Sequence, residues 1–295
     1  MPRLILFAAL LLAFARPAWA QPAEASQIVA AERAFAADGL IMGVDGAFLK
    51  WSTADAVMIA GGAPRLAHEI LDPAAVFDPT APSLVWWPNW AGISKSGDLG
   101  FTTGGVEVGG VRTGHYFTIW QRQDDGSWKW IYDGGVAASA AGVPGPETEP
   151  LLLPTSILES SSPDAAMSEV RTVEAVLAAS ALRDQKEAHL SLLAPDGRLY
   201  VAPLPPAIGA DAFPAALDGW PYSFELSTPF GGGSSAAGDM VWTYGRALWT
   251  RDEAPRAGHY VHLWQKRSMG WVLVFAQIIN DPPAAPVTSP PPAAG

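Results

Sequence analysis

Apolar strand-forming residues alternate with glycine-rich breaks from Gly97 to Gly135. Phe, Thr, Val, Tyr, Ile and Trp dominate the stretch, while glycines at 104–110 and Asp-Asp-Gly at 124–126 interrupt it. Residues of this kind between turn signals predict three successive antiparallel strands, with the last two joined by a tight hairpin.

The same pattern returns in the second half of the chain. Gly97-Asp98 is matched by Gly238-Asp239, and Gly114-His115-Tyr116 by Gly258-His259-Tyr260. Upstream, residues 170–193 repeat the first helical region and place Glu174 at the position of Glu32. These matches predict one fold used twice, with the second copy more divergent because it carries prolines at 203, 205 and 206.

The residues before the first strands predict helices and short strands. We expect the following elements: a helix over 26–51 broken near Gly39 or Gly43, a strand over 55–60, a short helix over 64–71, and a strand over 84–90 with a proline bulge. Helices followed by long antiparallel strands predict an α+β fold, in which a curved antiparallel sheet wraps over the N-terminal helices.

This succession resembles the NTF2-like superfamily, and within it the SnoaL-like and DUF4440 group. The resemblance rests on these segments: Glu32-Arg33-Ala34-Phe35, Ala54 to Val57, Ser96 to Thr102, and Gly114-His115-Tyr116 through Trp120 to Asp133. It implies two NTF2-like cone domains. It does not imply a reaction, because that family includes isomerases, cyclases and binding subunits.

Composition sets the expected boundaries. A basic residue, an apolar run and Ala18-Trp19-Ala20 predict a signal peptide over 1–20, and hence a periplasmic or secreted protein. We expect the first domain at 21–136, a Pro/Ala/Ser-rich linker at 137–165, the second domain at 166–281, and a disordered Pro/Ala tail at 282–295.

Charge and residue usage exclude several classes of partner. A net charge of −11 without a basic run argues against nucleic acid and anionic membrane surfaces. No later apolar run reaches membrane-helix length, so we expect no membrane contact after signal removal. The five histidines lack ligand spacing and cysteine is absent, so we expect no metal and no cofactor. No G-x-S-x-G motif supports a nucleophile.

The hairpin around Asp125-Gly126 defines a candidate site in the first domain. A two-residue turn there places Tyr116, Thr118 and Trp120 opposite Gly135, Asp133 and Ile131 on one face. Sparse polar groups among apolar walls are typical of a small-molecule pocket. Asp133 is then a candidate base or orienting carboxylate with a pKa raised by burial, or simply a structural group bonded to Thr118.

A turn at Met269-Gly270 defines the equivalent face of the second domain. It places Tyr260, His262 and Trp264 opposite Ile279, Gln277 and Phe275, so His262 and Gln277 are predicted to point inward. We expect a ligand in the first cone only, because prolines 203–206 distort the elements that would close the second.

The opposite face of the first hairpin is also apolar, with Phe117, Ile119, Trp130 and Tyr132 predicted there. A sheet that is apolar on both faces needs a second sheet. We therefore expect the two cones to pack sheet against sheet, giving a monomer that is an internal pseudo-dimer.

Three functions stay open at this point. The first is binding of a small apolar or aromatic molecule in the first cone. The second is a SnoaL-like lyase, isomerase or hydrolase with Asp133 as general base. The third is a structural or partner-binding module with filled cones. Ketosteroid isomerase chemistry is not expected, since its base position falls on Ala60 and Val201.

Overall fold

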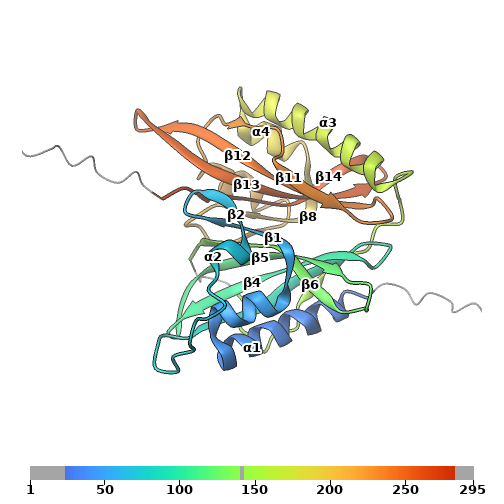
Figure 1. The fold of residues 1–295 in the computed structure, drawn as a ribbon. Helices are drawn as coiled ribbons and strands as arrows, with labels where there is room; N and C mark the ends of the chain where they lie inside the picture. Colours follow the sequence, from blue (N-terminus) through green and yellow to red (C-terminus); the bar gives the residue numbers. More distant parts are fainter. Residues whose placement is uncertain (1–23, 140–142, 283–295) are drawn as a thin grey trace, which may run out of the picture.

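A computed structural model describes residues 24–139 and 143–282 of this 295-residue chain. The proposed signal peptide and residues 283–295 of the proposed tail lie outside this range. Two domains, each a curved sheet with helices on its outer side, face each other through their sheets, with α1 below one and α3 above the other (Figure 1). The fold is α+β with two cone domains, as the sequence predicted.

The first domain contains one long helix and a seven-stranded sheet. Its elements are α1 (Ser26–Trp51), β1 (Ser52–Ala60), β2 (Ala63–Leu66), α2 (Ala67–Ile70), β3 (Leu84–Ile93), β4 (Leu99–Val108), β5 (Val111–Arg122), β6 (Trp128–Ala137) and β7 (Leu151–Leu152). The strand order is β2-β1-β6-β5-β4-β3-β7, antiparallel except for the parallel pairs β1–β6 and β3–β7.

The second domain repeats the plan with shorter helices. Its elements are α3 (Pro163–Ala181), α4 (Gln185–Leu190), β8 (Leu193–Tyr200), β9 (Ala207–Ile208), α5 (Phe213–Leu217), β10 (Glu225–Leu226), β11 (Gly231–Ser234), β12 (Met240–Arg251), β13 (Ala254–Arg267) and β14 (Gly270–Asn280). The order is β10-β12-β13-β14-β8-β9, with β11 also paired to β12 and β14 parallel to β8. In the residues described, no helix is both long and apolar enough to cross a bilayer.

Helix α1 lies in the concave face of the first sheet. Ile28, Phe35 and Phe48 are buried on one side of it, against indoles that include Trp86 and Trp120. The predicted break falls at Gly43, where φ is +80° and the helix kinks. The kink lets both halves of a 26-residue helix follow the curve of the sheet.

The predicted helix over 64–71 is wrong in its first half. Gly61 and Gly62 both have positive φ and form a two-residue turn, so residues 63–66 fold back as β2 against β1. Only residues 67–70 are helical. Pro64 is therefore in the edge strand of the sheet, where its missing N–H costs no ladder hydrogen bond.

Each long hairpin contains a β-bulge at an equivalent place. In the first, Ile119 pairs with Tyr132 but Trp120 pairs with Trp130, which leaves Ile131 as the extra residue. Trp130 therefore belongs to the core around α1, and the prediction that it lies on the opposite face is wrong. Ile131, predicted opposite Trp120, packs instead in the core between the sheets. A bulge reverses the alternation beyond it, and no residue pattern announced this one.

The predicted register of the second hairpin is wrong by one residue. Arg267 pairs with Gly270, so the turn is Ser268-Met269, and Gln277 pairs with Val261. His262 pairs with Ala276 instead. Gln277 consequently lies on the face toward the first domain, because a shift of one residue moves a strand's side chains to the other face.

A mixed apolar core joins the two sheets. The rings of Phe117 and Phe275 stack with centroids 3.8 Å apart and planes 4° apart, and Tyr132 packs on Trp242 at 5.4 Å. Thr103 and Tyr200 share a hydrogen bond of 2.7 Å between their hydroxyls. These contacts are the expected sheet-to-sheet packing within one chain.

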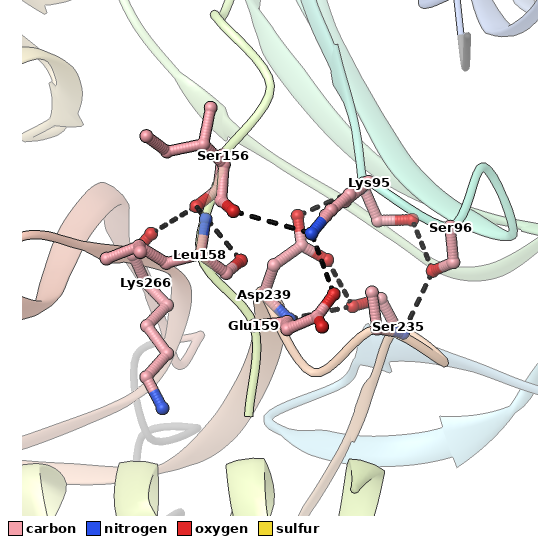
Figure 2. Close-up of polar contacts among 11 residues, drawn as sticks. Lys95, Ser96, Ser156, Leu158, Glu159, Ser235, Asp239 and Lys266 are labelled. Carbon is pink, nitrogen blue, oxygen red and sulfur yellow. Dashed lines mark hydrogen bonds and ion pairs between the residues drawn. The ribbon is translucent and has the colours of Figure 1, made fainter. Parts of the chain in front are cut away.

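Reciprocal hydrogen bonds tie the two domains at the β3–β4 and β11–β12 turns. The backbone N–H of Lys95 donates to Asp239 at 2.9 Å (Figure 2). In the other direction, the N–H of Ala236 donates to Asp98 at 2.9 Å. Asp98 and Asp239 are the two aspartates that the repeat matches. The contact is therefore symmetric between the domains.

The segment predicted as a linker is also part of the structure. Leu151 and Leu152 add a strand beside β3, and the Ser156 hydroxyl donates to the Lys266 carbonyl. Close by, the Lys95 ammonium binds Glu159 at 2.8 Å (Figure 2). The connection therefore contacts both domains where their turns meet.

Candidate functional site

A cavity of about 400 Å³ opens at the end of the first cone. Strands β3 to β6 and the last turns of α1 enclose it. Its walls are formed by Phe48, Leu84, Trp86, Val106, Thr113, Gly114, His115, Tyr116, Asp133, Gly134, Gly135, Val136 and Ala137. The size is within the usual range for small-molecule sites, and the walls are mainly apolar.

Asp133 is the only carboxyl group on this wall, and its side chain is 8% exposed. Thr118 donates to its Oδ2 at 2.6 Å, and the two residues pair as predicted, although the turn spans residues 124–126 and not Asp125-Gly126 alone. The pKa of Asp133 is raised to about 8, mainly by burial; the Thr118 hydrogen bond opposes this shift and the nearby charge of Glu32 adds to it. Asp133 is therefore mostly protonated at neutral pH and can donate a hydrogen bond into the cavity.

Glu32 lies deeper in the cone and is fully buried. Trp86 donates to its Oε1 at 2.6 Å, Trp120 donates to its Oε2 at 3.2 Å, and the Thr102 hydroxyl also donates to Oε2. Burial raises the pKa of Glu32 to about 7, although these three donors oppose the shift. The network positions Trp86, whose ring forms one wall of the cavity.

The other residues predicted for the first site divide between wall and support. Tyr116 lines the cavity, whereas Trp120 and Thr118 are fully buried behind it. Burial raises the pKa of Tyr116 well above its usual value. Among the described residues, the Tyr116 hydroxyl makes no hydrogen bond of normal geometry. The nearby hydroxyl of Thr102 nevertheless acts to lower the pKa of Tyr116 against the effect of burial.

His115 stands at the edge of the cavity, on the side of the second domain. Its ring is 5.3 Å from that of Tyr200, and neither ring nitrogen has a hydrogen-bond partner in the described part of the chain. Burial, followed by the charges of Arg112 and Arg198, lowers the pKa of His115 to about 4. The imidazole is therefore neutral at neutral pH.

The second cone is filled where the first is open. Ala276 occupies the position of Asp133, and Ile278 occupies that of Gly135. Trp220, Phe224 and Trp249 close the mouth beside Ile278, and the space that they line measures about 30 Å³. A ligand of ordinary size does not fit there.

His262 does point inward, as predicted, but toward a buried partner. Its Nδ1 is 3.0 Å from Oε1 of Glu174, which also accepts from Thr243 at 2.5 Å and from Trp264 at 2.8 Å. Burial acts to raise the pKa of Glu174, and the charge and hydrogen bonds around it, His262 first, bring that pKa below its usual value. Tyr260 and Trp264 belong to the surrounding core.

The residues that the sequence analysis missed are Glu32 as an organising group, together with the Phe48 and Trp86 walls. One signal could have found Glu32: an acidic residue on the apolar side of a helix, repeated as Glu174 in the second copy. Among the described residues, no group of three or more His, Cys, Asp or Glu side chains is placed to hold a metal ion.

Comparison with known proteins finds matches among solved structures. No family model matches the sequence, and no curated protein matches it. Among solved structures, an NTF2-like protein of unknown function from Shewanella oneidensis is 12% identical with a TM-score of 0.32, covering 38% of this chain and 97% of that one. A ketosteroid isomerase-like protein from Erwinia carotovora is 16% identical with a TM-score of 0.33, covering 39% of this chain and 96% of that one. An NTF2-like superfamily protein from Salmonella enterica is 11% identical with a TM-score of 0.34, covering 43% and 98%.

Proposed function

We propose that the first cone binds a small, uncharged, largely apolar or aromatic molecule that offers a hydrogen-bond acceptor to Asp133. The observation that carries this proposal is a cavity of about 400 Å³ with one protonated carboxyl on an apolar wall, in the cone whose counterpart is filled. A carboxylate ligand is disfavoured, because it would bring a negative charge near two acidic groups and no Lys or Arg side chain in the described part of the chain lines the cavity.

The test is a screen of neutral aromatic and carbonyl compounds by tryptophan fluorescence, with Trp86 in the cavity wall as a reporter. A compound that binds the wild type should lose about tenfold or more in affinity with Asp133→Leu, because an unpaired acceptor in the cavity costs about 1–3 kcal/mol. Asp133→Asn keeps a donor and should lose less. Val106→Phe should fill the cavity and abolish binding.

The matched control is in the second cone. His262→Ala leaves every wall of the first cavity in place, so binding should persist if the variant folds. The contrary result is a ligand that binds Asp133→Leu and Val106→Phe unchanged but fails to bind a folded His262→Ala variant. That result would show that the binding site is in the second cone and not in the first.

A second candidate function is acid–base catalysis of the SnoaL-like type, as a lyase, isomerase or hydrolase. It is favoured by a carboxyl group whose pKa of about 8 lies near the working pH, as proton transfer requires. Asp133 would serve as a general acid below pH 8 and as a general base above it. Turnover of a bound compound that rises through pH 8 and disappears in Asp133→Asn would support the base; turnover that is flat with pH would exclude it.

A purely structural role with filled cones is a third proposal, and the open first cavity counts against it.

The two domains are also proposed to be tandem copies of one ancestral domain. Support comes from the equivalent positions of Glu32 and Glu174, the paired bulges and the symmetric Asp98 and Asp239 contacts. Export to the periplasm or the medium is proposed from residues 1–20. Its test is the N-terminus of the mature protein, expected at Gln21.

A further inference from the structure

A second cavity of about 450 Å³ lies beside the first, between the kink of α1 and the loop over 75–83. Its lining comprises residues 39, 40 and 42–45 of α1, residues 75–79 and 81–83 of the loop, and Leu84. Leu84 also lines the first cavity. One half-buried side chain is therefore common to both cavities.

The wall of the second cavity presents apolar side chains to solvent. Val76 is 91% exposed, Leu40 49% and Phe77 40%. Isolated exposed residues need no explanation, but a group of them around a hollow is typical of a ligand or partner surface. Most of the chain's large apolar residues are buried, so this group is not a consequence of composition alone.

The acidic residues of this cavity are already engaged with backbone groups. Asp45 accepts from the N–H of Asp72 at 2.9 Å, and Asp78 accepts from the N–H and hydroxyl of Thr80 at 2.8 and 2.6 Å. They hold the loop in place. The lining contains no Lys, Arg or His side chain, so no cation there awaits an anionic ligand.

Leu84 and Trp86 of β3 lie between the two cavities, and they differ in how firmly they are held. Trp86 lies so close to α1 that a Cβ on Gly39 would be 2.7 Å from its ring, and Glu32 fixes its indole nitrogen. Leu84, two residues earlier, is the first residue of β3, and its half-buried side chain lines both cavities and donates to no buried carboxylate. A flexible chain could pass at Leu84 but not at Trp86.

We propose that the two cavities together bind one molecule, a neutral polar head attached to an unbranched alkyl chain. The head lies beside Asp133 in the first cavity, and the chain passes Leu84 to lie between the α1 kink and Val76. This inference rests on the proposed function of the first cone, since that cavity holds the head. A compact aromatic ligand would occupy the first cavity alone and leave the second without an occupant.

The experiment uses straight-chain 2-ketones from six to fourteen carbons, each measured below its solubility limit against the full mature chain by tryptophan fluorescence and calorimetry. Each buried methylene should tighten binding about fourfold. The gain should continue after the first cavity is full. Leu40→Gln and Val76→Ser should weaken the long ketones at least threefold and leave the short ones unchanged.

The matched control is Val176→Ser, the same change at an exposed valine of α3 in the other domain, and it should leave every ketone unaffected. If short ketones bind but affinity does not rise with chain length, the proposed role of the second cavity is wrong and the proposed function of the first cavity stands. The same holds if the gain survives in Leu40→Gln and Val76→Ser. If no ketone of any length binds, both proposals fail.

Discussion

Asp133 and Glu32 are buried in the first cone with pKa values of about 8 and about 7, because burial outweighs their hydrogen bonds. In the unfolded chain both release their protons near pH 4. The folded state holds these protons more tightly, so its stability from these groups is greatest at low pH and is lost as the pH rises toward 8. Burial lowers the pKa values of His115 and His189 to about 4, so below about pH 6.5 the unfolded chain binds their protons more tightly than the folded state does. These two histidines therefore make the folded state less stable as the pH falls from about 6.5.

The free energy of unfolding should therefore fall between pH 6.5 and 8, where only the carboxyl groups contribute. Each buried acid changes it by at most about 1.4 kcal/mol per pH unit. Asp133→Asn should flatten the decline by about 1–2 kcal/mol over that window. Urea unfolding at several pH values measures this. Asp55→Asn, at an exposed carboxylate, is the control and should leave the slope unchanged.

The buried pair of His262 and Glu174 should matter for stability and not for ligand binding. His262→Ala leaves the buried carboxylate of Glu174 without the ring nitrogen that lies 3.0 Å from its Oε1, and loss of a partner of a buried polar group typically costs about 1–3 kcal/mol. Adding Glu174→Gln should recover part of that loss because no uncompensated charge remains. A His262→Ala variant that loses less than about 1 kcal/mol in urea unfolding would contradict a stabilising contact between His262 and Glu174.

At the scale of one element, the kink in α1 depends on Gly43. A side chain at φ +80° is strained, and its Cβ would lie 3.2 Å from the ring of Phe77. Gly43→Ala should therefore cost about 1–2 kcal/mol of stability. Gly46→Ala, in the same helix with ordinary contacts of 3.4 Å to Met42, should gain up to about 1 kcal/mol. Thermal unfolding of both variants is the measurement; a loss of equal size in each would mean that the kink is not the cause.

The two β-bulges change which way the side chains of β6 and β14 face. Each inserts one residue, Ile131 or Val274, and thereby turns Trp130 or Leu273 toward the helices. The strands beyond each bulge bend more strongly, as bulged strands do. This curvature closes the sheet around α1 in the first domain and around α3 in the second.

At the scale of the molecule, the aromatic core between the sheets makes each domain dependent on the other. We expect the full mature chain to be a monomer. We expect an isolated first domain, residues 21–139, to dimerise or aggregate, because it would expose Phe117, Ile119 and Tyr132. Analytical ultracentrifugation of both proteins tests this. A stable monomeric half would show that the sheet-to-sheet contact is dispensable.

The sequence by itself determined the elements whose causes are local. Strand formers between glycine turns predicted β4 to β6, and a glycine within a helical pattern predicted the kink. Thr118 pairs with Asp133 as predicted, but only because the turn is one residue longer than predicted and the bulge at Ile131 restores the register. The repeat of the same residues predicted the second domain. Apart from the pairing of Thr118 with Asp133, each of these features depends on neighbours in the chain, and so it can be read from the sequence.

The tertiary structure alone decided the rest. The bulges and the Ser268-Met269 turn set which face Trp130 and Gln277 occupy, and a single inserted residue reverses that choice. Glu32 becomes an organising group only when side chains from β3, β4 and β5 converge on it. The second cone is closed because aromatic residues from separate loops and strands meet at its mouth. Whether a cone is open depends on how distant side chains fill a shared volume, and that packing is not encoded in any one stretch of the chain.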